Sequence, residues 1–115
     1  MEEKNFQRKL IKYFESLGCF VTKYNASGIS KVGVPDLSVC FKGIYLGVEV
    51  KKESGVISDI QQWNINQIRN AGGRAICIKP QDFDNVHRAI VTSTRALDEI
   101  QEICACNEKE ITKID

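Results

Sequence analysis

The chain has 115 residues, a length that favours one domain built around one hydrophobic core. Its 43% hydrophobic and 27% charged residues are typical of a globular protein, and no apolar run approaches the roughly 20 residues of a membrane span. Residues 1–52 carry nine Lys or Arg against five Asp or Glu, so this part of the chain is permissive for a phosphate-bearing partner.

The first third of the sequence predicts a helix, a short strand and an irregular loop. MEEKNFQRKL is too charged for a secretory signal, so we expect a cytoplasmic protein without a membrane partner. Apolar residues recur at helical spacing over residues 3–17, at Phe6, Leu10, Phe14 and Leu17. The segment 19–24 then favours a strand, and the glycines and small polar residues of 25–34 indicate a loop.

Two strands joined by a tight turn at Lys42-Gly43 follow, and then a second helix over residues 58–71. Ser58 with Gln61 three positions later is the pattern of a capping box, and a pair of glycines ends the helix. Trp63 points away from the apolar face of this helix. We expect it to lie under the C-terminal segment or in a contact between subunits.

The remaining sequence predicts a strand over 74–79, a helix from Pro80 to about Val91, and a further helix after Ser93. The order α-β-β-β-α-β-α predicts an α/β fold with a mixed four-stranded sheet flanked by helices. We divide the chain into a domain of residues 1–92 and a helical, acidic tail of residues 93–115 whose role the sequence leaves open. The five cysteines form no metal-knuckle pattern, although the Cys104-x-Cys106 pair leaves a minor metal alternative.

The two central strands place polar residues in an apolar setting. If Lys42-Gly43 is a two-residue turn, every cross-strand pair has numbers that sum to 85, and one face of the hairpin becomes an unbroken apolar layer. On the other face Asp36 then lies opposite Glu49, with Lys51 two residues further along.

Two opposed carboxylates repel each other unless a cation lies between them. One interpretation is a solvated strand end at which Lys51 and Lys52 are incidental partners. The other is a site for a divalent metal ion, because Mg²⁺ prefers carboxylate oxygens and shares its shell with water and substrate phosphates. The nearby ammonium would then orient the attacking water and offset the charge that grows on the phosphate.

Two further polar residues are predicted to turn inward near this pair. On a helical wheel Glu3 falls within the apolar stripe of the first helix, whereas Glu2 falls outside it. Gln61 lies on the inner face of the second helix. Each has an ordinary explanation as well, since an acid favours a helix N-terminus and Gln61 completes a capping box.

A family resemblance joins these features. Pro35-Asp36, twelve intervening residues and Glu49-Val50-Lys51 match the PD-(D/E)xK motif of the restriction-endonuclease-like nucleases. The longer context resembles the VRR-NUC (virus-type replication-repair nuclease) domain over about residues 3–90. The segments that carry it are Glu3 with Gln7, GVPDL (33–37), GVEVK (47–51), Ser58 with Gln61, and AGG (71–73).

The resemblance implies a role for each matching residue. Asp36, Glu49 and the Val50 carbonyl look like ligands of Mg²⁺ or Mn²⁺, Glu3 resembles a further acid associated with the metal, and Lys51 looks like the catalytic lysine. Gln61 resembles a glutamine near the scissile phosphate. Stand-alone members of the family, often from phages, are similar to Holliday junction resolvases and act as homodimers, which implies a bacterial or phage-infected host cell.

These features lead us to expect a divalent-metal-dependent endonuclease for branched DNA, a homodimer with no small-molecule cofactor. Backbone contacts to DNA are expected from basic residues of the first half, namely Lys4, Arg8, Lys9, Lys12, Lys23, Lys31 and Lys52. Two alternatives stay open at this point. One is a flap or nicking nuclease with the same chemistry, and the other is a catalytically silent DNA-binding subunit, against which the intact Asp36, Glu49 and Lys51 count.

Overall fold

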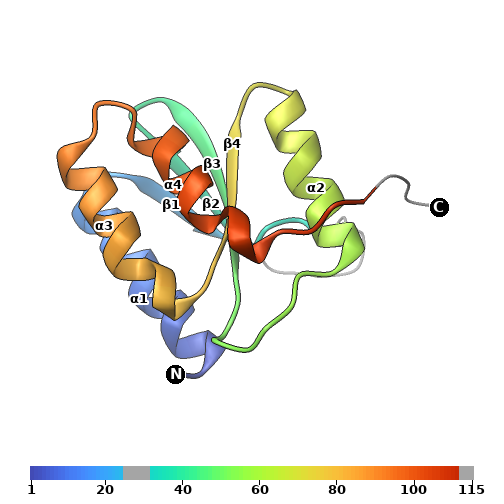
Figure 1. Ribbon diagram of the computed structural model, residues 1–115. Helices are drawn as coiled ribbons and strands as arrows, with labels where there is room; N and C mark the ends of the chain where they lie inside the picture. The colour runs from blue at the N-terminus through green and yellow to red at the C-terminus, as the bar shows by residue number, and fades with distance from the viewer. Residues whose placement is uncertain (25–31, 112–115) are drawn as a thin grey trace.

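The computed structural model describes residues 1–24 and 32–111, and its elements follow the predicted order, including the further helix after Ser93 (Figure 1). The helices are α1 (Glu3–Ser16), α2 (Asp59–Asn70), α3 (Phe83–Thr92) and α4 (Ala96–Cys104). The strands are β1 (Phe20–Lys23), β2 (Leu37–Phe41), β3 (Ile44–Val50) and β4 (Arg74–Ile78). Short 3-10 turns occupy Pro80–Asp82 and Ala105–Asn107.

The strands form one mixed sheet in the order β1-β2-β3-β4. The first three strands are antiparallel to one another, whereas β3 and β4 are parallel and are connected through α2. The predicted hairpin register is confirmed, since its pairs are Leu37–Val48, Ser38–Gly47, Val39–Leu46, Cys40–Tyr45 and Phe41–Ile44. Lys42 and Gly43 have φ angles of 48° and 83°, the left-handed pair that matches a two-residue turn to the twist of the strands.

The helices cover the two faces of the sheet unequally. Figure 1 shows α1, α3 and α4 on one side and α2 alone on the other. The first side holds the main core, in which apolar residues of these three helices meet the apolar layer of the hairpin. On the second side, Ile57 and Ile65 form a smaller cluster with Ala75 and Cys77 of β4, with Ile68 at the margin. The α2 face of the sheet is therefore the side with room for polar groups.

The predicted tail contributes to the main core. Leu97, Ile100 and Cys104 of α4 are buried there, although α4 lies beyond the boundary drawn at residue 92. The division of the chain at residue 92 stays a prediction. All five cysteines are free thiols, and within the described ranges no helix has the length and apolarity needed to cross a membrane.

The segment before β2 approaches α2 closely at Gly33. Its φ angle is +79°, and a Cβ atom there would lie 2.9 Å from Ile60 Cγ1 and 3.0 Å from both the Ile60 carbonyl carbon and Asn64 Nδ2. Only glycine combines this backbone conformation with such a close approach. Gly33 therefore sets how near the segment that leads to Asp36 lies to α2.

We expect Gly33→Ala to lower the free energy of unfolding by roughly 2–4 kcal/mol, because backbone strain and overpacking add. Gly18 provides a matched control, since its φ angle is +84° and nothing lies within 4 Å of its added Cβ. Gly18→Ala should cost only about 1–2 kcal/mol from the left-handed conformation. Urea unfolding of both variants measures the difference, and equal losses would contradict the close approach.

Candidate active site

Asp36 stands immediately before β2 and is fixed on both sides by backbone hydrogen bonds. Its carbonyl oxygen accepts from the Tyr24 amide at 2.8 Å, which ties it to the end of β1. Its carboxylate oxygen Oδ2 accepts from the Val50 amide at 2.9 Å. The side chain of Asp36 therefore reaches across to β3 at the residue that follows Glu49.

Glu49 is a buried acid on the α2 face of β3, with 3% of its surface exposed. Its Oε2 accepts a hydrogen bond from Gln61 Nε2 at 3.1 Å, whereas its buried Oε1 has no hydrogen-bond partner among the described residues. The pKa of Glu49 is raised to about 9, first by burial and then by the nearby Asp36 carboxylate, whose effect exceeds the lowering by the Lys51 ammonium. The arrangement favours a cation or a proton at this position.

Lys51 extends from β3 on the same side as Glu49. Its ammonium lies 4.0 Å from Glu49 Oε2, and its side chain is 15% exposed. The Lys51 amide donates to the Ile78 carbonyl at 3.0 Å, which continues the pairing of β3 with β4. The lysine is thus held by the sheet itself, and its charge borders the buried acid.

Gln61 fits both interpretations that the sequence allowed. The capping box is present, because Gln61 Oε1 accepts from the Ser58 amide at 3.0 Å and Ser58 Oγ accepts from the Gln61 amide at 3.2 Å. The inward orientation is also confirmed by the bond from Nε2 to Glu49. Because the cap holds the oxygen of the side-chain amide, its NH₂ group is the part that faces Glu49.

Glu3 differs from its predicted position. The wheel placed it on the buried stripe of α1, but it is exposed, and the first buried residue of the helix is Phe6. Glu3 begins the helix, so its side chain lies beyond the region that the sheet covers. Its charge nevertheless contributes to the raised pKa of Glu49, so it belongs to the same end of the molecule.

The described residues contain no group of three His, Cys, Asp or Glu side chains close enough together to hold a metal ion. Asp36 and Glu49 are therefore the acid pair of this site, and Glu3 is not gathered with them. Within the same part of the chain, Cys104 and Cys106 belong to no such group.

The basic residues expected to contact DNA lie on more than one surface. Lys4, Arg8, Lys9, Lys12, Lys23 and Lys52 are exposed, and Lys31 lies outside the described residues. α1 covers the face of the sheet opposite to Glu49, and Lys9 sits 4.2 Å above the ring of Phe83 on that side. Of this set, Lys52 directly follows the lysine of the site.

Asn64 is a site-supporting residue that sequence reasoning missed. It is buried on α2, and its Nδ2 donates to the carbonyls of Val32 at 3.0 Å and Ile60 at 2.9 Å. Asn64 thereby fastens the start of the segment that carries Asp36 to the helix that carries Gln61. An asparagine that shares a helix face with Ile60, Ile65 and Ile68 gave no signal of a partner that lies 32 residues away.

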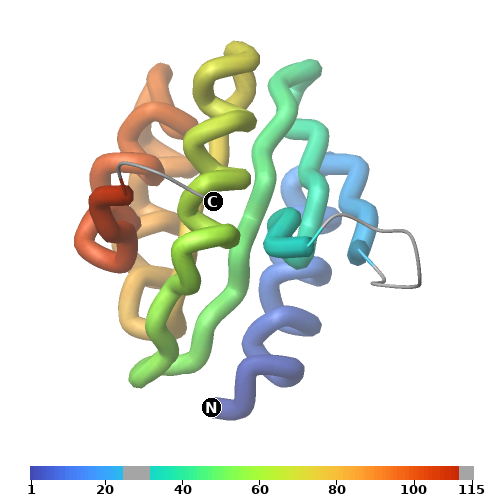
Figure 2. Tube along the Cα trace, turned by 90° about the vertical axis from the view of Figure 1, so that its right-hand side faces the viewer, coloured from blue at the N-terminus to red at the C-terminus, as the bar shows by residue number. Residues whose placement is uncertain are grey.

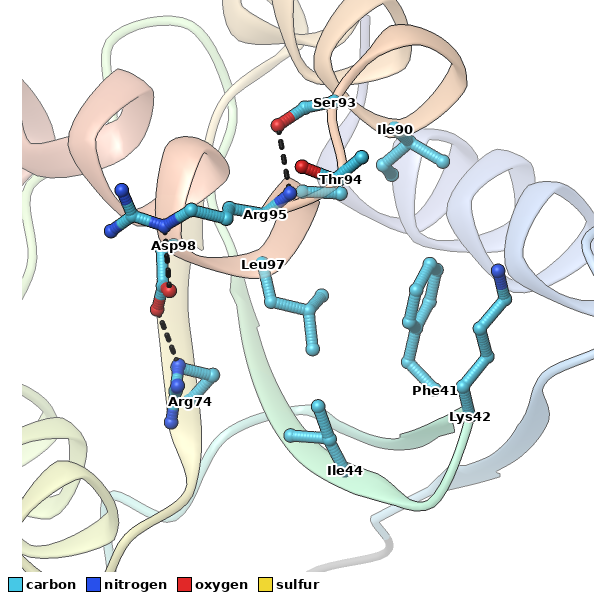
Figure 3. Close-up of a pocket in the computed structure, with 11 residues that line it drawn as sticks. Phe41, Lys42, Ile44, Arg74, Ile90, Ser93, Thr94, Arg95, Leu97 and Asp98 are labelled. Carbon is cyan, nitrogen blue, oxygen red and sulfur yellow. Dashed lines mark hydrogen bonds and ion pairs between the residues drawn. The ribbon is translucent and has the colours of Figure 1, made fainter.

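A cavity of about 510 Å³ lies at the other end of the sheet, between the β2–β3 turn and the link from α3 to α4 (Figure 3). Phe41, Ile44 and Leu97 line it, and two arginines stand at its edge. Both arginines are paired with Asp98, Arg74 at 2.7 Å and Arg95 at 3.8 Å. The cavity opens beside the start of β3, whereas Glu49 is near the strand's end, so it is separate from the acid pair.

The sequence and the structure are both similar to those of known nucleases. The family model described as archaeal Holliday junction resolvase (Hjc) matches residues 2–110. A solved structure of a VRR_NUC domain has 29% sequence identity and a TM-score of 0.64, covering 79% of this chain and 96% of that one. The Holliday junction resolvase Hjc of Archaeoglobus fulgidus has 21% identity and a TM-score of 0.53, with 66% of each chain covered.

No curated protein matched the sequence. The restriction-endonuclease-like fold expected from the sequence is confirmed by the two structures. The family match spans nearly all of the described fold, and the acid pair with its lysine lies at the end of the central strands. The chain therefore belongs to the archaeal Holliday junction resolvase (Hjc) family and is an endonuclease of branched DNA.

Proposed function

We propose that this chain is a homodimeric Holliday junction resolvase that hydrolyses DNA with a divalent metal ion bound at Asp36 and Glu49. The observation that carries the proposal is the Glu49 carboxylate, which is buried against another acid and has one oxygen without a partner among the described residues. A buried acid in that condition is costly unless a cation binds it.

The residues at this position fit Mg²⁺ or Mn²⁺. Carboxylate and carbonyl oxygens are the ligands that these hard ions prefer, and Asp36, Glu49 and the Val50 carbonyl offer three. Exposed Glu3 would act from the edge of the site. When bound, the ion would supply a water of lowered pKa and offset the negative charge of the phosphate.

The chain's own residues have separate tasks. The Lys51 ammonium, held by the sheet beside Glu49, would orient the attacking water and stabilise charge on the phosphate oxygens. The Gln61 amide donates to Glu49 and keeps that carboxylate in one orientation. The site lies at one end of the sheet. Lys52, and Lys4 at the start of α1, would contact the DNA backbone there.

The DNA-binding role of the other basic residues rests on their exposure and charge. Contacts from Arg8, Lys9, Lys12 and Lys23 would go to phosphates, which carry no sequence information and suit recognition of a branched shape. Lys31, outside the described residues, belongs to the same proposal.

The dimer follows from the symmetry of the substrate. A four-way junction presents two equivalent strands, and one chain carries one acid pair, so two chains are needed for paired cuts. Trp63 remains 39% exposed on α2, which makes it a candidate for the contact between subunits. Ile11 and Tyr13 are half-buried on α1 and are weaker candidates, because they pack against the main core.

The raised pKa of Glu49 gives a prediction for the metal-free protein. Because its pKa is about 9 in the folded chain and near 4.5 when unfolded, the stabilisation from holding its proton is full below about pH 4.5 and is lost as pH rises toward 9. Glu49→Gln should therefore raise the free energy of unfolding at pH 8 by up to about 5 kcal/mol in EDTA, and the gain should vanish near pH 4. Chemical unfolding at both pH values tests this, with the exposed Glu15→Gln as control.

Asp36→Asn, Glu49→Gln and Lys51→Ala should each lower the rate of four-way junction cleavage by at least about 1000-fold without unfolding the protein.

EDTA should stop cleavage by the wild type, Mn²⁺ should restore it, and Ca²⁺ should support DNA binding with little turnover. Gel assays with labelled junctions measure cleavage, and gel shifts in Ca²⁺ measure binding. Glu2→Gln is the control for a charge change at this end. Near-wild-type turnover in any of the three variants would refute the assignment.

We expect a dimer at micromolar concentration and paired, symmetric nicks on a four-way junction. Light scattering gives the mass, and strand-specific labels give the nick positions. Trp63→Ala should weaken the dimer if α2 forms the contact, whereas Phe20→Ala, another exposed aromatic, should not. A monomer that still cuts branched DNA would favour the flap or nicking nuclease instead.

A further inference from the structure

The chain that follows α4 crosses the molecule and binds α2. Figure 1 shows it passing from the end of β4 toward α2, and Figure 2 shows the same segment alongside that helix. We call residues 105–110 the C-terminal strap. It lies on the same face of the sheet as Glu49, because α2 covers that face.

The strap begins at a fixed point beyond the end of β4. Asn107 Nδ2 donates to the Cys77 carbonyl at 2.8 Å and to Asp82 Oδ2 at 2.6 Å. Asp82 is itself buried and also accepts from the Lys79 amide at 2.8 Å. The first part of the strap is therefore anchored to the strand that pairs with β3.

The middle of the strap clamps α2 through an arginine. Both carboxylate oxygens of Glu108 bind the guanidinium of Arg69, with an Nη2–Oε2 distance of 2.8 Å. Arg69 also donates to the Ala75 carbonyl at 2.7 Å and to Gln101 Oε1 at 3.1 Å. A two-pronged, partly buried pair of this kind is strong and fixes direction as well as distance.

The strap then reaches the first turn of α2. Gln62 is only 2% exposed, and its side chain donates to Glu108 at 3.0 Å and accepts from the Lys109 amide at 3.1 Å. The Lys109 ammonium lies 2.6 Å from Asp59 Oδ1. These contacts flank Gln61, the residue that donates to Glu49.

The apolar packing between α2 and the sheet is small. The apolar cluster under α2 has four buried residues, Ile57, Ile65, Ala75 and Cys77, and two of these side chains are small. Small apolar contacts tolerate sliding, whereas hydrogen bonds with defined partners do not. The strap therefore adds contacts with defined partners to the turn of α2 that carries Gln61, where the apolar cluster is small.

We propose that Glu108 and Lys109 are positioning residues, which hold the first turn of α2 so that the Gln61 amide stays on Glu49. The proposal rests on the proposed function, in which Gln61 orients a carboxylate of the active site. It assigns a role in the reaction to a part of the chain that the sequence left without one.

Glu108→Gln is the main test, since it removes one charge and keeps the shape of the side chain. We expect kcat on a synthetic four-way junction to fall about 10-fold, with KM changed by less than about 2-fold, because misplacement affects the reaction more than binding. Lys109→Ala, at an exposed position, is the second variant and should give a smaller loss. Asp98→Asn is the matched control, because it breaks another partly buried ion pair that does not touch α2.

A double-mutant cycle separates positioning from general loss of stability. In the Gln61→Ala background, Glu108→Gln should change kcat by less than about 2-fold, because its effect passes through Gln61. All assays are run well below the unfolding temperature of each variant. Equal losses from Glu108→Gln in both backgrounds, or no loss in the wild-type background, would overturn the proposal.

A second readout does not depend on turnover. The side-chain amide signal of Gln61, identified by its absence in Gln61→Ala, should shift in NMR spectra of metal-free Glu108→Gln and stay in place in Asp98→Asn. An unmoved signal in Glu108→Gln would overturn the role of the strap. Full activity of Gln61→Ala would instead remove the role of Gln61 in the proposed function, so the two failures are distinguishable.

Discussion

The buried carboxylate of Glu49 is the constraint on which the rest of the structure depends. An acid with 3% exposure is unfavourable in a central strand, and Asp36 beside it makes the ionised form more unfavourable still. The fold tolerates this cost because Gln61 donates to one oxygen and Lys51 lies near it. Any positive charge near these two acids lowers their mutual repulsion, so this end of the sheet favours a proton or a cation.

The topology of the sheet brings the two acids together. The two-residue turn fixes the hairpin register, and this register carries Asp36 to the residue beside Glu49. The parallel pairing of β3 with β4 then requires a crossover, which places α2 over the face that holds Glu49. Gly47, two residues before Glu49, leaves the space that Pro35 and Ile68 occupy between strand and helix. An alanine there would press on both.

The two faces of the sheet are held by different kinds of contact. The side covered by three helices holds the large apolar core, which sets the stability of the fold. The side covered by α2 is fastened by polar contacts, including the capping box, Asn64 and the C-terminal strap. Hydrogen bonds with defined partners set distances between side chains, which an active site needs more than it needs burial. The Gln61 side chain does both: its oxygen accepts from the Ser58 amide at the start of α2, and its NH₂ group donates to Glu49.

Local patterns in the sequence were enough for the element order, the hairpin register and the acid pair with its lysine. Each depends on residues close in the chain or on the two-residue period of a strand, which the sequence displays directly. Tertiary structure alone decided the rest. Glu3 proved exposed because a helical wheel gives an angle but not how far the neighbouring sheet extends. Asn64 and Glu108 find partners 32 and 39 residues away, and their side chains show no periodicity by which such partners could be recognised. Packing of α4 and the strap against β4 and α2 gives these residues their roles, because only the folded chain brings the partners within hydrogen-bonding distance.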